Sequence, residues 1–259
     1  MSTTPTRLST LYSVQELMEA VGEEVGEGHL FVFDLDETLV VCEEPAFQCA
    51  NMFRFKALFR SMWSPLDDEQ KYLCMNAIAQ SYPSRLLEPC TPSFLADIAK
   101  GGAKAIALTA SLGGEVYERE RIAKLRSLGI DFAAAFPGKA SFSLTSLPSF
   151  LGHPPSFREG VIFANGRVSS KGEVLLAFLS EIDITPRQLL FVDDRAENVV
   201  SVDTACRMKG IDCKAFHFQT PPSFLPGEVD AKTFESGWRG LINEITSQLS
   251  AANSINKLF

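Results

Sequence analysis

The sequence lacks the cysteine and histidine patterns of a zinc site or a disulfide framework. Its six cysteines form no CxxC pair, and none has metal-ligand spacing to His29, His153 or His217. Scattered thiols in a chain of 259 residues indicate core positions in a protein of a reducing compartment. We therefore expect buried free thiols and no zinc.

Basic residues are outnumbered: 24 Lys and Arg stand against 32 Asp and Glu, which gives a formal net charge of −8. Binding to DNA or RNA needs clustered positive charge, so no nucleic-acid partner is expected. A small phosphorylated substrate is still compatible with this charge, because a bound metal ion or a local basic pocket reverses the sign of the field.

Long apolar runs are also missing. The segment from Met1 to Thr10 is polar and has no apolar stretch typical of a Sec signal peptide. No run reaches membrane-spanning length. We expect a soluble, cytoplasmic protein without a membrane partner, and delivery elsewhere by a route that needs no Sec signal stays open. The 46% of hydrophobic residues suffices for one large core domain with a modest insertion.

Apolar runs alternate with amphipathic segments along most of the chain. Strands are predicted at His29 to Asp34, Ala103 to Thr109, Leu189 to Asp193 and Cys213 to Phe218, and helices are predicted to open at Ser13, Ser64-Pro65, Thr91-Pro92, Gly114, Gly172 and just after Asp194. This alternation predicts an α/β fold, with a Rossmann-like parallel sheet and helices on both faces. The active site of such a sheet lies beyond the carboxyl ends of its strands.

Two stretches interrupt the alternation. Leu39 to Pro89 is longer than a crossover needs and rich in aromatic residues, most of which would pack a core of their own. We interpret it as an inserted helical cap over the site. Ile130 to Gly160, rich in Pro and Ser, is expected to be a functional lid or a flexible loop. The predicted domains are an N-terminal helix at 1–28, a core at 29–41 and 90–259, and a cap at 42–89.

The segment Asp34-Leu35-Asp36-Glu37-Thr38 follows the first strand directly. Two carboxylates two positions apart point the same way in extended chain. One can attack a phosphoryl group while the other transfers protons. The plain alternative is that both carboxylates cap the next turn, but two negative charges exceed what one turn needs.

This DxDxT segment resembles the first motif of the haloacid dehalogenase superfamily, in particular its phosphatase branches. Three further segments resemble its later motifs in the same order: the strand that ends at Thr109, Lys171 before a helix, and Asp193-Asp194 with Asn198 beyond. The likeness spans Leu30 to Val202 and is greatest to an uncharacterised bacterial branch.

The resemblance implies a HAD-like core and a role for each motif residue. Asp34 would be the nucleophile and a Mg²⁺ ligand, and Asp36 the general acid and base, with its carbonyl on the metal. Asp193 would bind Mg²⁺ directly, and Asp194 directly or through water. The remaining residues would bind phosphate (Thr109, Ala110, Lys171) or support the site (Thr38, Asn198). Dehalogenases lack the second Asp, and ion pumps differ at Leu35 and Asp36.

Several alternatives stay open. Asp193-Asp194 could cap a helix, Thr109 is ordinary at a strand end, Asn198 could be exposed, and Lys139 competes with Lys171 for the phosphate. No basic residue stands near Ser111, so recognition of the substrate would fall to the cap, with Arg54 and Arg60 as candidates.

The sequence therefore predicts a Mg²⁺-dependent phosphatase, a phosphate-monoester hydrolase that acts on a small metabolite or a phosphorylated side chain. The alternatives are a phosphotransferase or phosphomutase of the same superfamily, and a non-catalytic binding or effector-like protein on the same scaffold.

Overall fold

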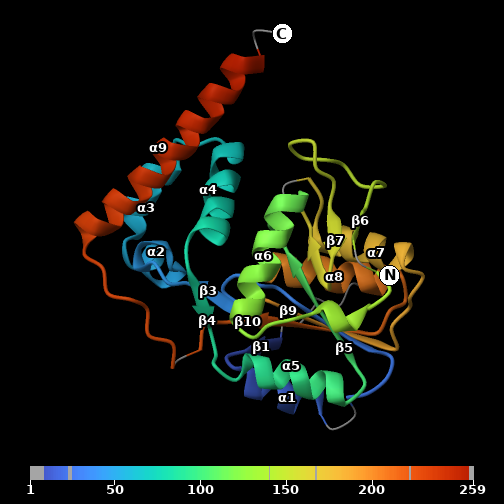
Figure 1. The fold of residues 1–259 in the computed structure, drawn as a ribbon. Coiled ribbons are helices and arrows are strands. Elements are labelled where there is room, and N and C mark those ends of the chain that lie inside the picture. The colour runs from blue at the N-terminus through green and yellow to red at the C-terminus, as the bar shows by residue number, and fades with distance from the viewer. Residues whose placement is uncertain (1–8, 23–24, 140, 167, 222, 257–259) are drawn as a thin grey trace, which may run out of the picture. The chain divides into compact units, whose positions relative to one another are not determined.

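The computed structural model describes residues 9–22, 25–139, 141–166, 168–221 and 223–256 (Figure 1). Two compact units are formed. The first contains Met1–Val40 and Leu86–Phe224, and the second contains Val41–Arg85 and Leu225–Phe259. Each unit is therefore assembled from two separate stretches of chain.

The first unit is built on an eight-stranded sheet. Neighbouring strands pair in parallel from β1 through β10, β9, β2 and β5 to β8. The last three strands, β8, β7 and β6, pair antiparallel. The predicted α/β fold with a mostly parallel sheet is confirmed. In spatial order the strands are β1 (Ser9–Leu11), β10 (Cys213–Phe218), β9 (Gln188–Asp193), β2 (His29–Phe33), β5 (Lys104–Thr109), β8 (Val161–Phe163), β7 (Ser156–Arg158) and β6 (Ser141–Ser143).

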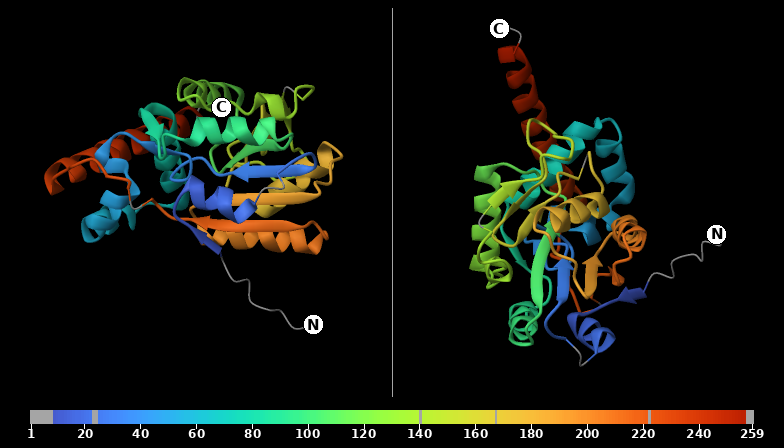
Figure 2. Two further views of the ribbon diagram at one scale, coloured as in Figure 1. Left: turned by 90° about the horizontal axis from the view of Figure 1, so that it is seen from below. Right: turned by 90° about the vertical axis from the view of Figure 1, so that its right-hand side faces the viewer.

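Helices cover both faces of this sheet (Figure 2), because successive side chains of a strand point to opposite faces. In β2, Leu30 and Val32 join the core cluster that contains α7 and α8. Phe31 and Phe33 point the other way and meet the Phe94 ring of α5 edge-on, at centroid distances of 6.5 and 6.0 Å. The helices of this unit are α1 (Val14–Val21), α5 (Thr91–Lys100), α6 (Glu115–Ser127), α7 (Lys171–Glu181), α8 (Ala196–Met208) and the short 3₁₀ helix η2 (Ala133–Ala135).

The segment from 130 to 160, expected as a lid or loop, contributes to the sheet instead. It contains η2, β6 and β7. Phe142 and Phe157 pack against Phe178 of α7, with ring centroids 6.2 and 4.9 Å away. The two strands have three residues each, too few for a period of two to stand out among the surrounding Pro and Ser.

The N-terminal segment, predicted as a separate helix at 1–28, is not a domain of its own. Residues 1–8 of the predicted N-terminal unit lie outside the described residues. From Ser9 on, the chain forms β1, which pairs with β10, and then α1, which opens after its N-cap Ser13 as predicted. The Ser13 hydroxyl accepts the Glu16 N–H, but the Glu16 carboxylate accepts the Tyr12 N–H at 2.7 Å, so the pair does not form a capping box. The segment therefore forms part of the first unit.

The second unit is mainly helical, and no described helix combines the length and apolar character needed to span a bilayer. Residues 40–42 and 84–86 pair as the two strands of a small sheet. The elements are β3 (Val40–Cys42), η1 (Pro45–Phe47), α2 (Cys49–Arg54), α3 (Lys56–Trp63), α4 (Asp68–Ser81), β4 (Ser84–Leu86) and α9 (Ala231–Asn256).

Trp238 of α9 forms the centre of this unit. Its ring lies 5.1, 4.9 and 5.5 Å from the rings of Phe47, Phe59 and Trp63. Its Nε1 donates a hydrogen bond to the Ala46 carbonyl at 2.8 Å. The assignment of 225–259 to the core domain was therefore wrong, because the aromatic side chains of the insertion need α9 to complete their own core.

One predicted helix start is also displaced. Ser64 ends α3 as its C-cap, and the next helix, α4, begins only at Asp68. Asp67 is its N-cap and forms a capping box with Gln70. The two-sided hydrogen bonding of the box outweighs the Ser64-Pro65 signal.

All six cysteines lie among the described residues, and no two of them form a disulfide. Cys74 and Cys206 are buried, but Cys49 and Cys90 are exposed. The expectation that the thiols are core residues is wrong for the latter two.

Replacing Phe234 by Ala should lower the free energy of unfolding of the second unit by about 3–5 kcal/mol, because the ring is fully buried. Trp63 and Trp238, the chain's two tryptophans, both lie in this unit. Their fluorescence during urea unfolding therefore reports its stability.

The matched control is Phe53→Ala. The Phe53 ring is 76% exposed, so its loss should change stability by only about 0.5 kcal/mol. Equal effects of the two substitutions would contradict the assignment of α9 to this core.

Candidate active site

The order of the strands reverses beside β2. From β2 the chain adds β5 and β8 on one side and then returns to place β9 and β10 on the other. Ligands of open α/β sheets bind beyond the carboxyl ends of the strands at such a switch point. Asp34 follows β2 and Asp193 ends β9, and the Asp34 N–H donates to the Val192 carbonyl at 2.8 Å. Two of the predicted site residues thus stand on either side of the switch point.

Lys171 links these two carboxylates. Its Nζ forms ion pairs with Oδ1 of Asp34 and, at 2.7 Å, with Oδ2 of Asp193. The Thr38 hydroxyl donates to Oδ2 of Asp34 at 3.2 Å. All four side chains are buried. Residues from three separate parts of the sequence therefore form one hydrogen-bonded group.

The start of α7 explains how Lys171 reaches this position. Ser170 caps the helix in a capping box with Glu173. The Gly172 N–H donates to Oγ of Ser201 in α8 at 3.1 Å, and a Cβ on Gly172 would stand 2.5 Å from the Ser201 carbonyl oxygen. Only glycine permits this close approach of α7 to α8. The alternative lysine, Lys139, is exposed on the turn after η2.

Asp193 is held by two further donors. Its Oδ1 accepts the Asn198 side-chain amide and the Arg195 N–H, both at 2.9 Å. Asn198, on the first turn of α8, therefore faces the site and not solvent alone. Asp193 does bond the backbone at the start of α8, as the capping interpretation expected, but its other oxygen binds Lys171.

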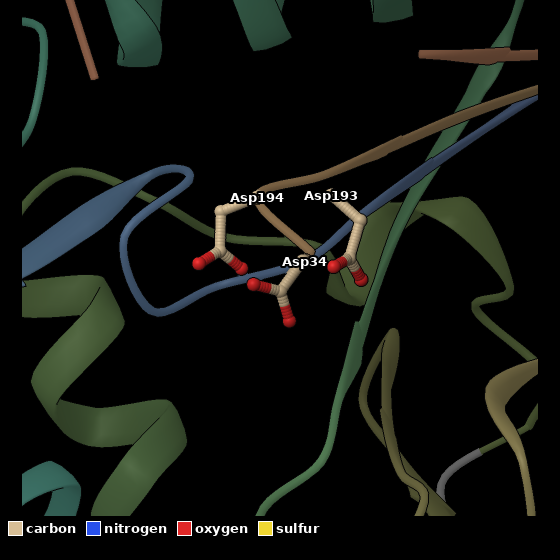
Figure 3. A group of neighbouring side chains, drawn as sticks. All are labelled: Asp34, Asp193 and Asp194. Carbon is tan, nitrogen blue, oxygen red and sulfur yellow. The ribbon is translucent and has the colours of Figure 1, made fainter. Parts of the chain in front are cut away.

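Asp34, Asp193 and Asp194 form a carboxylate cluster (Figure 3). Each offers one oxygen, and these oxygens lie within 4.8 Å of one another. Burial raises the pKa of Asp34 to about 7, and neighbouring Asp193 adds to the rise while Lys171 opposes it. Burial, then Asp34 and Asp193, raise the pKa of Asp194 to about 9. Burial alone would lower the pKa of Lys171, but Asp34 and Asp193 raise it, so this lysine stays protonated.

One lysine does not balance three clustered carboxylates. A divalent cation would supply the missing charge, and a set of carboxylate oxygens suits Mg²⁺, which prefers few carboxylates plus water and phosphate oxygens. The donor set therefore fits the metal that the motifs imply.

Thr109 and Ala110 lie at the same edge of the sheet, because β5 pairs with β2 in parallel. The buried Thr109 hydroxyl donates to Oγ of Ser111 at 3.0 Å and accepts the Ser111 N–H. The Ala110 carbonyl accepts the Gly166 N–H at 3.1 Å. These bonds shape the loop after β5, and the role of the two residues in phosphate binding stays a prediction.

Asp36 has a partner that the sequence analysis missed. Its Oδ1 lies 2.6 Å from Nη2 of Arg121 in α6, a side chain with no exposed surface. A usable signal existed, because Arg121 falls on the buried helix face at helical spacing with Ile122 and Leu125. A charged residue on such a face is unusual unless it is paired.

A mostly parallel α/β sheet with Asp34, Asp193 and Lys171 at its carboxyl edge is the arrangement that the resemblance of the motifs led us to expect. The chain belongs to the family described as "Protein of unknown function (DUF2608)", whose model matches residues 10–249. An uncharacterized protein from Rickettsia felis is 22% identical over 178 residues, which cover 66% of this chain and 58% of that protein. The match thus spans little more than half of the relative's length.

Solved structures give distant likenesses. A haloacid dehalogenase-like family hydrolase from Streptococcus pneumoniae is 15% identical, with a TM-score of 0.37, and the match covers 72% of this chain and 83% of that one. The HAD domain of effector protein Lem4 from Legionella pneumophila is 14% identical, with a TM-score of 0.39, and the match covers 87% of this chain and 96% of that domain. The magnesium complex of a HAD family enzyme from Bacteroides thetaiotaomicron is 14% identical, with a TM-score of 0.39, and the match covers 82% of this chain and 99% of that one.

Mg²⁺ should raise the melting temperature of the wild-type protein, and EDTA should reverse the rise. A ligand that binds only the folded state stabilises it by about 2.7 kcal/mol at 100 times its Kd. Asp193→Asn and Asp194→Asn should each remove most of this increment, because each takes one oxygen ligand from the cluster. Differential scanning fluorimetry at several Mg²⁺ concentrations measures it.

Asp97→Asn serves as the control, since this carboxylate is exposed and pairs with a surface lysine, Lys100, on α5. The metal assignment is wrong if wild type shows no Mg²⁺-dependent shift, or if Asp97→Asn loses the shift as fully as Asp193→Asn.

Proposed function

We propose that the chain is a Mg²⁺-dependent phosphate-monoester hydrolase that works through an aspartyl-phosphate on Asp34. The observation that carries this proposal is the position of Asp34 at the switch point, where it shares the Lys171 ammonium with Asp193. A nucleophile for phosphoryl transfer needs a neighbouring cation that offsets the repulsion between its own charge and that of the phosphate. The ion pairs of Lys171 with Asp34 and Asp193 support this role for its ammonium group.

In the first half-reaction a carboxylate oxygen of Asp34 attacks the phosphorus atom of the monoester. The bond from phosphorus to the ester oxygen breaks, and the electron pair leaves with that oxygen. Asp36 donates a proton to it, so the product leaves as a neutral alcohol. The phosphoryl group is then bound to Asp34 as a mixed anhydride.

The second half-reaction returns the residues to their starting state. Asp36, now a carboxylate, takes a proton from water as the water oxygen attacks phosphorus on the face opposite the Asp34 oxygen. The bond from phosphorus to Asp34 breaks. Inorganic phosphate leaves, Asp34 is again a carboxylate, and Asp36 is again protonated.

Charge in the site is shared among the chain's own groups and the metal. Asp34, Asp193 and Asp194 would hold Mg²⁺, with the Asp36 carbonyl as the resemblance implies, and the ion would offset charge on the transferred phosphoryl group. Lys171 would keep Asp34 and Asp193 in place and bind the phosphoryl oxygens. Thr109 and Ala110 would bind the same group from the next strand.

The test is hydrolysis of p-nitrophenyl phosphate by wild type, Asp34→Asn and Asp36→Asn, with Mg²⁺ or with EDTA. Turnover should require Mg²⁺ and vanish in Asp34→Asn, which lacks the nucleophilic oxygen. Asp36→Asn should lower kcat by about 10²–10⁴-fold, the usual contribution of general acid–base catalysis. It should also accumulate an enzyme heavier by one phosphoryl group, visible in intact-protein mass spectra.

Asp97→Asn should retain the wild-type rate. Full activity in Asp34→Asn would sink the proposal. Metal binding without turnover of any phosphate ester, and without trapping of beryllium fluoride on Asp34, would favour the non-catalytic alternative. Transfer of phosphate to an added alcohol in preference to water would instead identify a phosphotransferase.

A further inference from the structure

Helix α6 carries two buried charged residues one turn apart, Glu118 and Arg121. Glu118 anchors the helix to β7. Its Oε1 accepts the Ser156 hydroxyl at 2.5 Å and the Gly114 N–H at 3.0 Å, and its Oε2 pairs with Nε of Arg158 at 2.7 Å. The hydrogen bonds from Ser156, Gly114 and Arg158 outweigh burial and lower the pKa of Glu118. The base of α6 is thus fixed by a fully charged, buried group.

Arg121, one turn further along, reaches the turn after β2. Its Nη2 lies 2.6 Å from Oδ1 of Asp36. The two partners differ sharply in exposure, since the Arg121 side chain is 0% exposed and that of Asp36 is 45% exposed. A buried cation thus holds a carboxylate that stays open to solvent.

Stability alone does not account for this arrangement. Burial of a guanidinium is unfavourable, and replacement of a buried ion pair by apolar residues is often neutral or stabilising. A position on the apolar face beside Ile122 and Leu125 would therefore suit a leucine or methionine. The presence of Arg121 calls for another reason.

Direct binding of the substrate does not account for it either. A side chain without exposed surface presents no donor to a phosphate that arrives from solvent. Arg121 contacts the carboxylate of Asp36, to which the proposed function gives both proton transfers.

The backbone of Asp36 is fixed as well. The Leu35 carbonyl accepts the Leu39 and Val40 N–H groups, both at 2.9 Å, which closes a tight turn around Asp36. Glu37 takes a positive φ of 61° within it. The backbone of the turn and the Arg121 guanidinium together leave the carboxyl little freedom to rotate.

We propose that Arg121 is a positioning residue of this site. It binds Oδ1 of Asp36 and thereby directs Oδ2 of the same carboxyl group toward the leaving-group oxygen. The inference rests on the proposed function. It assigns to α6 a part in proton transfer, carried by the buried arginine, without contact between this helix and the substrate. Effective general acid catalysis requires the donor to be held within hydrogen-bond reach of the oxygen it protonates.

The test compares two substrates of similar shape, p-nitrophenyl phosphate and phenyl phosphate. The p-nitrophenolate leaves as a stable anion, whereas phenolate needs a proton more strongly. The ratio kcat/KM reports events up to loss of the leaving group, so it isolates the step in which Asp36 acts as acid. Wild type, Arg121→Gln, Arg121→Lys and Arg158→Gln are measured with both esters and Mg²⁺.

Arg121→Gln should lower kcat/KM for phenyl phosphate at least about tenfold more than kcat/KM for p-nitrophenyl phosphate, a fraction of the full general-acid contribution. Arg121→Lys, which keeps the charge, should recover part of the difference. Arg158→Gln removes the ion pair that Glu118 of the same helix forms with β7, without touching Asp36, and it should affect both esters alike.

The double variant Asp36→Asn/Arg121→Gln gives a second, independent reading. Once Asp36 cannot transfer a proton, loss of Arg121 should not increase the difference between the esters any further. This variant removes both charges of the pair, so it also serves if Arg121→Gln alone does not fold.

Equal losses on both esters in Arg121→Gln, or a further selective loss in the double variant, would overturn the role of Arg121. Either result can occur with normal wild-type turnover and an inactive Asp34→Asn, in which case the phosphatase proposal stands. Activity in Asp34→Asn would instead remove the proposed function itself.

Discussion

The site depends on the pair of ion pairs that the ammonium group of Lys171 forms with Asp34 and Asp193. Asp34 and Asp193 end neighbouring parallel strands, and two buried carboxylates so close to each other repel unless a cation lies between them. The cation comes from a helix that follows much later in the chain, and its position requires the contact of Gly172 with Ser201 in α8. The packing of two helices on one face of the sheet thus determines the charge balance at its edge.

The core of the fold and the carboxylates of the site were predictable from the sequence because their signals are local. The apolar runs that precede Asp34 and Asp193 each indicate a buried strand, and the aspartate marks the end of that strand. The helix that carries Lys171 begins at Ser170 with a capping box, which is also a short-range pattern. Parallel pairing then brings these distant segments together by a general rule of α/β sheets.

The elements that were missed depend on contacts between distant residues. The three-residue strands β6 and β7 are too short for a periodic pattern. Helix α9 does carry Phe234, Trp238, Leu241 and Ile245 at helical spacing, but nothing in that spacing says that its partners lie near Phe47. Arg121 pairs with a residue 85 positions away, and only the fold shows that its buried charge meets Asp36.

The division of the chain into units has a consequence for how such a protein evolves. The described residues of the carboxylate and cation site, Arg121 included, belong to the first unit, whereas the second is built from 41–85 and the C-terminal helix. Its aromatic centre around Trp238 is self-contained. Mutations there are constrained by packing and not by the charge balance around Lys171, so the second unit can diverge in sequence while the residues of the site are kept.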